Sequence, residues 1–292
     1  MGKQEMGGMH NPATGQLVIF LSPHFDDIPL SCAGAAAQLS TMGARCIGLV
    51  VCAAPPPPDR PLSDYARMLH ARWEQAAGTD VQAINEVRRE EERQAMRLLG
   101  IEPVWLHFPD AIYRQSPSGR HYYTSDAQLF GEVDREEIRE LVPRIAAEIR
   151  RVARERNSRG RVRVFAPLAV GCHVDHQLVF RAARHLGPRF GVLFYEDYPY
   201  AAVPGALQAR LNRLSMPARP RLLSISELIG LKIAAIARYK SQLPVLFGSA
   251  EAMPAAVRAY AQAVAQTLPP DSGVRYAERY WQLPSIYTLV ER

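Results

Sequence analysis

Five short apolar runs, separated by stretches with helical character, are the feature that most constrains the fold of this chain. The runs are Leu17–Leu21, Arg45–Cys52, Pro103–Phe108, Val162–Phe165 and Gly191–Tyr195. Runs this short and continuous are typical of strands that are buried on both faces. The stretches expected to be helices are Ser31–Met42, Ile84–Leu99, Asp134–Arg156 and Asp175–Leu186. Their alternation predicts an α/β fold in which helices cover both faces of a mostly parallel sheet, a Rossmann-like three-layer α/β/α architecture.

The chain beyond about residue 200 follows a different pattern. Ala201–Pro220 mixes Pro, Gly and Arg without a clear period, so we expect a loop or cap there. Ser226–Gln242, with Ser226 as N-cap, and Ala250–Thr267 are predicted to be helices. No change of composition marks a second domain. We therefore expect residues 1–292 to form a single α/β domain, to which about residues 200–292 add a loop and a helical extension.

The composition is that of a globular protein with a sizeable core. Hydrophobic residues make up 48% of the 292 residues and charged residues 22%, so the chain is neither disordered nor fibrous. The 35 Lys and Arg exceed the 29 Asp and Glu. No dense basic patch is interleaved with aromatic residues, so we expect no nucleic-acid partner. The sequence contains neither GxGxxG nor GxxxxGK[ST], so we expect no nicotinamide cofactor.

The cysteines and the apolar segments bear on the compartment. Cys32, Cys46, Cys52 and Cys172 show no CxxC spacing, which favours free thiols in a reducing compartment. Residues 1–16 lack the apolar segment of a signal peptide, and no run approaches the roughly 20 apolar residues of a membrane span. We therefore expect a cytoplasmic protein without a membrane span. The sequence leaves the oligomeric state open, a homo-oligomer included.

Two clusters of His and Asp each follow a predicted strand. Pro23-His24-Phe25-Asp26-Asp27 comes after the first run, and His173-Val174-Asp175-His176 follows the fourth. The carboxyl ends of parallel strands meet at one edge of a sheet, so we expect the clusters to face one another. Three ligands drawn from His and carboxylates, with one position left for water, are typical of catalytic zinc. A His₂Asp set also suits Fe²⁺ and Co²⁺.

The spacing of the clusters suggests how the roles divide. His24 and Asp27 lie in one tight loop and can ligate the same ion, and either His173 or His176 completes the set. Such an ion lowers the pKa of its water to about 7. Asp26 is then free to act as general base, and the remaining imidazole polarises a carbonyl or protonates a leaving amine.

These clusters resemble the motifs of the PIG-L/LmbE-like zinc-dependent N-deacetylases, which act on N-acetylglucosamine-type amides. Members of that family carry (P/A)HPDDE after the first strand and HPDH after a later one. The resemblance implies that His24, Asp27 and His176 are the metal ligands and that Zn²⁺ is the cofactor. It also implies that the substrate is a small molecule with an N-acetylated amino sugar.

The same resemblance assigns the other site residues. It makes Asp26 the general base and His173 the electrophilic or general-acid imidazole, hydrogen-bonded to Asp175 as its orienter. Arg88, in a helix that fits the family pattern RxxE…LG, and Asp110, in a segment similar to (Y/F)PD, would bind the substrate.

Two departures from the family pattern stand in the first motif. Phe25 replaces the Pro, and Ile28 replaces the Glu that follows the Asp pair. The segment from Lys232 to Tyr239-Lys240-Ser241-Gln242 is similar to the family's KxxAxxxYxSQ, and we expect it to be a structural helix end.

We therefore predict a metal-dependent hydrolase that removes an N-acetyl group from an N-acetylglucosamine-type sugar or its conjugate. One alternative keeps the metal chemistry but cleaves a thiol-conjugate amide, with the loops Ala53–Asp80 and Tyr113–Asp126 setting the shape of the substrate. The other, motivated by Ile28, is a non-catalytic sugar- or nucleotide-binding protein with a degenerate metal site.

Overall fold

A seven-stranded sheet forms the centre of the protein. The computed structural model describes residues 14–56, 58, 60–77, 81–156 and 160–284. The strands are β1 (Leu17–Ser22), β2 (Arg45–Val50), β3 (Glu102–Trp105), β4 (Val162–Pro167), β5 (Phe190–Tyr195), β6 (Arg219–Ser224) and β7 (Ala277–Gln282). Their order across the sheet is β3-β2-β1-β4-β5-β7-β6. The first five strands are parallel, whereas β7 runs antiparallel to both β5 and β6. The predicted mostly parallel, Rossmann-like sheet is confirmed.

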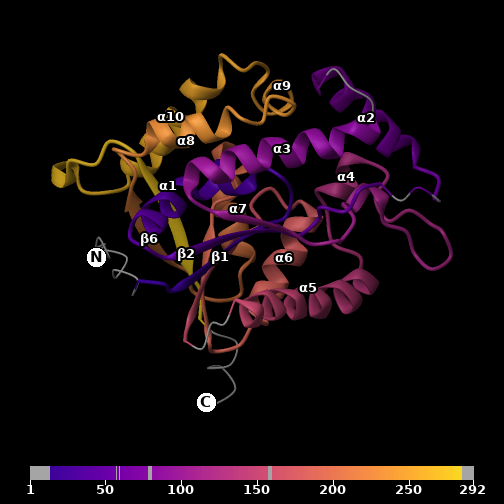
Figure 1. Ribbon diagram of the computed structural model, residues 1–292, viewed down its shortest axis with the longest axis horizontal. Coiled ribbons are helices and arrows are strands. Elements are labelled where there is room, and N and C mark those ends of the chain that lie inside the picture. Colours follow the sequence, from indigo (N-terminus) through magenta and orange to yellow (C-terminus); the bar gives the residue numbers. More distant parts are fainter. Residues whose placement is uncertain (1–13, 57, 59, 78–80, 157–159, 285–292) are drawn as a thin grey trace.

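Helices cover both faces of this sheet. They are α1 (Asp27–Thr41), α2 (Asp64–Ala77), α3 (Val81–Leu99), α4 (Asp126–Leu129), α5 (Arg135–Glu155), α6 (Val174–Arg184), α7 (Ala206–Arg213), α8 (Ile229–Ile236), α9 (Leu243–Phe247) and α10 (Met253–Ala265). Helices α1, α3, α8 and α10 lie on one side, and α5 and α6 lie on the other (Figure 1). Among the described residues, no helix has both the length and the apolar character needed to cross a membrane.

Strand β1 shows why the sheet is buried on both faces. All six of its residues are buried. Leu17, Ile19 and Leu21 pack with residues of α5 and α6. Val18 and Phe20 pack with residues of α1, α3 and α8. Alternate side chains of a strand point to opposite faces, so a continuous apolar run serves two cores. The end of β1 is thereby fixed in the middle of the molecule.

Helix α1 begins earlier than the sequence predicts. Its first residue is Asp27 rather than Ser31. Pro29 does not prevent this start, because the first turn of a helix leaves its N–H groups without intrahelical partners. The helix is kinked at Cys32, where φ is −144° and ψ is 25°. Gly34 allows close packing beyond the kink, since a Cβ there would lie 2.2 Å from Cγ2 of Ile225.

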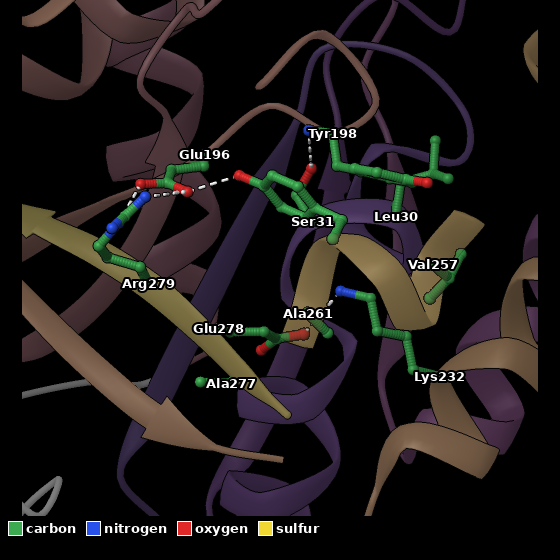
Figure 2. Close-up of a pocket in the computed structure, with 11 residues that line it drawn as sticks. Leu30, Ser31, Glu196, Tyr198, Lys232, Val257, Ala261, Ala277, Glu278 and Arg279 are labelled. Atoms are coloured by element: carbon green, nitrogen blue, oxygen red, sulfur yellow. Dashed lines mark hydrogen bonds and ion pairs between the residues drawn. The ribbon is translucent and has the colours of Figure 1, made fainter. Parts of the chain in front are cut away.

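A buried ion pair stabilises this kink. Glu278 of β7 accepts hydrogen bonds from the N–H groups of Gly34 (2.9 Å) and Ala35 (3.0 Å), just past the break in α1. Lys232 of α8 donates to the same carboxylate at 2.8 Å, as Figure 2 shows. Both partners are about 5% exposed. The C-terminal part of the chain is thus attached to the helix that carries the first motif.

Several predicted elements of the C-terminal third are wrong in extent. The helix expected over Ser226–Gln242 is only α8, and Ser226 is not its N-cap. The hydroxyl of Ser226 instead accepts from the N–H groups of Arg275 (3.0 Å) and Tyr276 (3.3 Å), ahead of β7. The loop expected over Ala201–Pro220 contains α7, and the extension also contains β6 and β7.

The segment Ala53–Asp80, expected to be a loop, contains α2. Strands β6 and β7 escape prediction because their segments, RPRLLS and AERYWQ, mix charged and apolar residues and form no continuous apolar run.

The ion pair of Lys232 and Glu278 provides a test of this attachment. We expect Glu278→Gln to lower the free energy of unfolding by about 3 kcal/mol, because it leaves a buried ammonium group without its counter-charge. Urea unfolding followed by circular dichroism measures the change. The matched control is Glu140→Gln, which removes the exposed pair with Arg144 at 2.7 Å and should cost less than about 1 kcal/mol. If both variants lost the same free energy of unfolding, the buried pair would contribute no more to stability than the exposed pair.

Candidate active site

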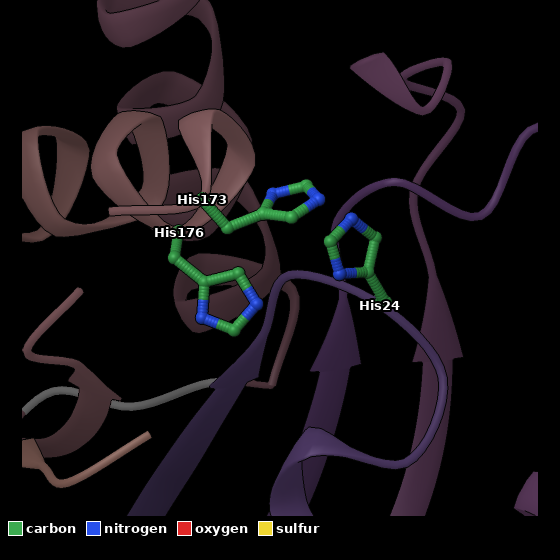
Figure 3. Close-up of side chains that lie close together, drawn as sticks. All are labelled: His24, His173 and His176. Carbon is green, nitrogen blue, oxygen red and sulfur yellow. The ribbon is translucent and has the colours of Figure 1, made fainter. Parts of the chain in front are cut away.

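The two His/Asp clusters lie side by side at the carboxyl end of the sheet. Strands β1 and β4 are direct neighbours, so the loops that follow them meet. The ring of His24 lies 4.7 Å from that of His173 and 5.4 Å from that of His176, measured between centroids (Figure 3). His173 is the N-cap of α6, and His176 lies in its first turn. The predicted meeting of the two clusters is therefore present.

The loop after β1 adopts a strained conformation that presents two carboxylates. The N–H of His24 donates to Oδ2 of Asp27 at 2.7 Å, which closes the loop. Asp26 lies between them with φ at 93°, in the left-handed region. A residue other than glycine pays about 1–3 kcal/mol for such a conformation, so the surrounding contacts must hold it.

His24 is oriented by a buried carboxylate. Oδ2 of Asp175 lies 2.9 Å from Nε2 of His24. Asp175 is fully buried, and burial opposes its charge, but Arg114 and then His24 hold its pKa well below the ordinary value. An ionised carboxylate only accepts, so Nε2 of His24 is the donor and Nδ1 is left for another partner. Burial lowers the pKa of His24, but the hydrogen bond to Asp175 and the charge of Asp110 outweigh it and raise the pKa to about 9.

His176 has an equivalent arrangement with a different carboxylate. Its Nδ1 lies 2.7 Å from Oδ1 of Asp197, which follows β5, and its Nε2 faces Oδ1 of Asp27 at 3.5 Å. Asp197 also accepts from the N–H of Val170 at 2.8 Å. The sequence assigned no role to Asp197, although its position just after the fifth strand placed it near the same edge of the sheet.

These contacts make a donor set that fits a divalent metal ion. Nδ1 of His24 lies 3.9 Å from Oδ2 of Asp27, and Nε2 of His176 lies 3.5 Å from Oδ1. Ligands at 2.0–2.1 Å in a tetrahedral zinc site lie about 3.4 Å apart. Each imidazole is also held by a carboxylate through its other nitrogen, as metal-ligating histidines usually are. The residues present therefore fit a metal.

A second set of three donors shares two of these residues. His24, His173 and His176 each offer a ring nitrogen, and the three nitrogens lie within 4.8 Å of one another. The donors near His24 therefore include both His173 and His176, the two residues between which the sequence left the second cluster's ligand open. Assignment of His24, Asp27 and His176 as the ligands stays a prediction.

Asp26 is buried beside the guanidinium of Arg88. Its Oδ2 lies 4.0 Å from Nη2 of Arg88. Burial raises the pKa of Asp26 well above its ordinary value, and the charge of Asp27 adds to the rise while Arg88 opposes it. Arg88 stacks on the rings of Phe25 and Trp73 at 5.3 and 5.6 Å. A carboxylate whose pKa is shifted toward neutrality suits proton transfer.

The predicted contact between His173 and Asp175 exists, but through other atoms. The main-chain N–H of Asp175 donates to Nδ1 of His173 at 3.2 Å, in the manner of an N-cap. The carboxylate of Asp175 is not the orienter of His173, because it bonds His24, Arg114 and the N–H of Ala111. Burial, and then the charge of His24, lower the pKa of His173 well below its ordinary value. The ring is therefore neutral, with its proton on Nε2.

Asp110 lies at the rim of the same site. Its Oδ2 is 3.7 Å from Nε2 of His24, and its side chain is 17% exposed. Its Oδ1 accepts from the N–H of Ile112 at 3.2 Å. The predicted substrate-binding residues Arg88 and Asp110 thus both lie beside the clusters, and their contact with a substrate stays a prediction.

Comparison with known proteins agrees with this geometry. The family model described as "PIG-L: GlcNAc-PI de-N-acetylase" matches residues 19–186, which include both clusters. This chain belongs to the PIG-L family. The resemblance inferred from the two motifs is confirmed.

Relatives of this PIG-L protein are deacetylases. It is 33% identical over 237 residues to 2'-N-acetylparomamine deacetylase of Niallia circulans, covering 79% of this chain and 82% of the relative. The zinc-inhibited form of teicoplanin deacetylase matches with 26% identity and a TM-score of 0.76, over 92% and 98% of the two chains. N,N'-diacetylchitobiose deacetylase from Pyrococcus horikoshii, at 20% identity and a TM-score of 0.53 over 92% and 84%, shares the fold. This PIG-L protein is an enzyme of the deacetylase class.

The departure from the family pattern at Ile28 has a structural explanation. Ile28 is fully buried in the core between α1 and the sheet. Its Cδ1 would lie 3.2 Å from a Cβ built on Gly48 of β2. The side chain therefore serves the packing of this PIG-L protein's core.

A network from the C-terminal part of this PIG-L protein holds the loop of Asp26. Oε2 of Glu92, a fully buried residue of α3, accepts from the N–H of Asp26 at 3.1 Å and from the hydroxyl of Tyr239 at 2.7 Å. The neighbouring Glu91 accepts from the N–H and the hydroxyl of Ser241 at 2.9 and 2.6 Å. The segment that was expected to be only a structural helix end therefore supports the site.

The contact between Asp197 and His176 yields a test of the donor set. We expect Asp197→Asn to weaken metal binding by about 10- to 100-fold, because an amide orients the imidazole less firmly and makes it a poorer ligand. Isothermal titration of metal-stripped protein with Zn²⁺ measures the affinity. The thermal midpoint of the metal-free variant controls for a general loss of structure. Unchanged affinity in a folded variant would remove His176 from the ligand set.

Proposed function

We propose that this protein is a zinc-dependent deacetylase that removes the acetyl group from an N-acetylglucosamine-type amino sugar or its conjugate. The observation that carries the proposal is the pair of imidazoles, His24 and His176, each held by a buried carboxylate and each facing Asp27. The name of the relative from Niallia circulans supports the substrate class, since 2'-N-acetylparomamine carries an N-acetylated amino sugar.

The proposed metal ligands are His24, Asp27 and His176. When bound, the ion would polarise the amide carbonyl and supply a water of lowered pKa. Zinc is proposed over Fe²⁺ and Co²⁺ on the family resemblance, and the test below includes Fe²⁺.

Asp26 is proposed as the general base. Its raised pKa brings the carboxylate closer to the pKa of the proton it removes from the attacking water. The left-handed backbone at Asp26 turns this residue away from the helix that begins at Asp27, so the two adjacent carboxylates take different roles. Protonated Asp26 is then the source of the proton that the leaving amine requires.

His173 is proposed to stabilise the developing negative charge on the carbonyl oxygen. Because Nδ1 accepts from the N–H of Asp175, the neutral ring carries its proton on Nε2 and donates from there. A preformed hydrogen-bond donor of this kind favours the transition state over the substrate. The role of electrophile therefore fits His173 better than that of general acid.

Arg88 and Asp110 are proposed to contact the sugar. Their side chains are 13% and 17% exposed at the rim of the site. Nη2 of Arg88 donates to the carbonyl of Phe25 at 3.4 Å, and Nε is buried without a partner among the described residues, so the guanidinium keeps donor capacity that the protein does not use. Asp110 keeps acceptor capacity on Oδ2.

Acetate release from a panel of N-acetylglucosaminyl compounds tests the proposal. The panel is given to metal-stripped protein and to protein reconstituted with Zn²⁺ or Fe²⁺, and includes a cysteinyl amide conjugate. Metal-dependent release from an amino sugar is expected. Cleavage of the thiol conjugate alone would make the enzyme an amidase of another class. Stoichiometric metal with no hydrolysis would favour a binding protein.

Replacement of Asp26 by Asn separates catalysis from metal binding. We expect Asp26→Asn to retain a full equivalent of zinc and to lose at least about 100-fold in kcat, because the amide cannot accept the proton. Metal content by atomic absorption and acetate release on the preferred substrate measure both. A variant that keeps more than about a tenth of the rate would exclude Asp26 as base.

The support of Asp26 by Tyr239 predicts a smaller effect. Tyr239→Phe removes the hydroxyl that Glu92 accepts from, and we expect kcat to fall about tenfold with KM little changed, as for the loss of one hydrogen bond to a charged group. The matched control is Tyr280→Phe, which removes a similarly buried bond of 2.5 Å to Glu278. Both variants should lose stability. A kcat loss of the same size in both would show that Tyr239 acts only on stability.

A further inference from the structure

Cys52 lies against the first motif, although nothing in the proposed mechanism uses it. It follows β2, and its N–H donates to the carbonyl of Pro23 at 2.9 Å. Its side chain is buried, with the residue 7% exposed. β2 is the neighbour of β1 in the sheet, so a thiol at the end of β2 is placed beside the loop that carries His24.

The thiol belongs to another set of potential metal donors. Sγ of Cys52, a ring nitrogen of His24 and a carboxylate oxygen of Asp175 all lie within 4.8 Å of one another. Nε2 is the nitrogen of His24 that approaches Asp175, at 2.9 Å, and Oδ2 of Asp110 lies 3.7 Å from that same nitrogen. Thiolate, imidazole and carboxylate are each ligands that zinc accepts.

The ring of His24 lies between this set and the proposed ligand set of His24, Asp27 and His176. Nδ1 faces Asp27, at 3.9 Å, whereas Nε2 faces Asp175 and Asp110. The two nitrogens of an imidazole lie on opposite sides of the ring, so the two sets do not share a ligand atom. Each can receive a cation, but both depend on His24.

We infer that this protein has a second, thiophilic metal site, formed by Cys52, Asp175 and Nε2 of His24, whose occupation inhibits the enzyme. The inhibitory part rests on the proposed function. Binding displaces the thiol proton of Cys52 and the Nε2 proton of His24 to solvent, and it forms a metal–sulfur and a metal–nitrogen bond. The thiolate makes the site selective for Zn²⁺, Co²⁺ or Cd²⁺ over Mg²⁺ and Mn²⁺.

The second ion inhibits because it removes a hydrogen bond that orients His24. Once Nε2 is a ligand, the hydrogen bond from His24 to Asp175 is lost, and with it the contact that orients the ring toward Asp27. Two cations held on opposite nitrogens of one ring also repel one another. The first equivalent of zinc should therefore support activity, and an excess should reduce it.

Titration of the metal-stripped, full-length protein with Co²⁺ tests the site directly. A cobalt ion bound by a thiolate gives a near-ultraviolet charge-transfer absorption that histidine and carboxylate ligands do not give. We expect this absorption to be absent with the first equivalent and to appear with the second. Its appearance with the first equivalent, or its absence throughout, would overturn the inference.

Variants connect the absorption to inhibition. We expect Cys52→Ser and Cys52→Ala to lose the second-equivalent absorption and to retain activity in a tenfold excess of Zn²⁺ that reduces wild-type activity at least tenfold. Cys46→Ser is the matched control, since Cys46 is also a buried free thiol of the β2 segment, and it should behave like wild type. Undiminished zinc inhibition in both Cys52 variants would overturn the inhibitory role.

The two proposals fail differently. The cobalt absorption reports the second site whether or not any substrate is cleaved. Absorption at the second equivalent without acetate release from any compound would leave the site standing and overturn the proposed function. Acetate release with no thiolate absorption would support the proposed function and overturn the second metal site.

Discussion

The carboxylate of Asp175 is the group on which the geometry of the site depends. It is fully buried and ionised, and it bonds His24 from the loop after β1, Arg114, and the N–H of Ala111. Arg114 extends the contact to Glu137 of α5, at 2.5 Å. A buried charge is costly unless it is fully paired. Removal of Arg114 or His24 would therefore lower the free energy of unfolding. One carboxylate thereby fixes the relative positions of β1, α5, α6 and the turn after β3.

The acidic residues of this site have different pKa values because their surroundings differ. Asp175 is held ionised by Arg114, whereas burial and Asp27 raise the pKa of Asp26. Asp27 is committed to the N–H of His24 and faces both imidazoles. Separate environments of this kind allow carboxylates a few ångströms apart to serve as hydrogen-bond acceptor, base and ligand. The proposed chemistry therefore depends on burial and pairing as much as on residue type.

The sequence predicted the parts of this structure that follow from local pattern. Continuous apolar runs predicted all five parallel strands, and two motifs at strand ends predicted that the segments of His24 and His176 meet. The partners of these residues were harder to find. Asp197, Arg114 and Glu92 are ordinary charged residues in the sequence, and only burial beside a site residue gives them a role. The antiparallel strands β6 and β7 were missed for a related reason, since their mixed polarity resembles that of a loop.

The support of Asp26 by Tyr239 has a consequence for how the enzyme comes into being. Every proposed metal ligand, and Asp197 behind His176, has been synthesised by residue 197. The loop that carries Asp26 still lacks Tyr239, and the kink in α1 lacks Glu278. During synthesis, the nascent chain therefore contains all the proposed metal ligands before it contains the residue that holds Asp26 in place. Full activity would therefore be reached only after Tyr239 and the last strand have joined the fold.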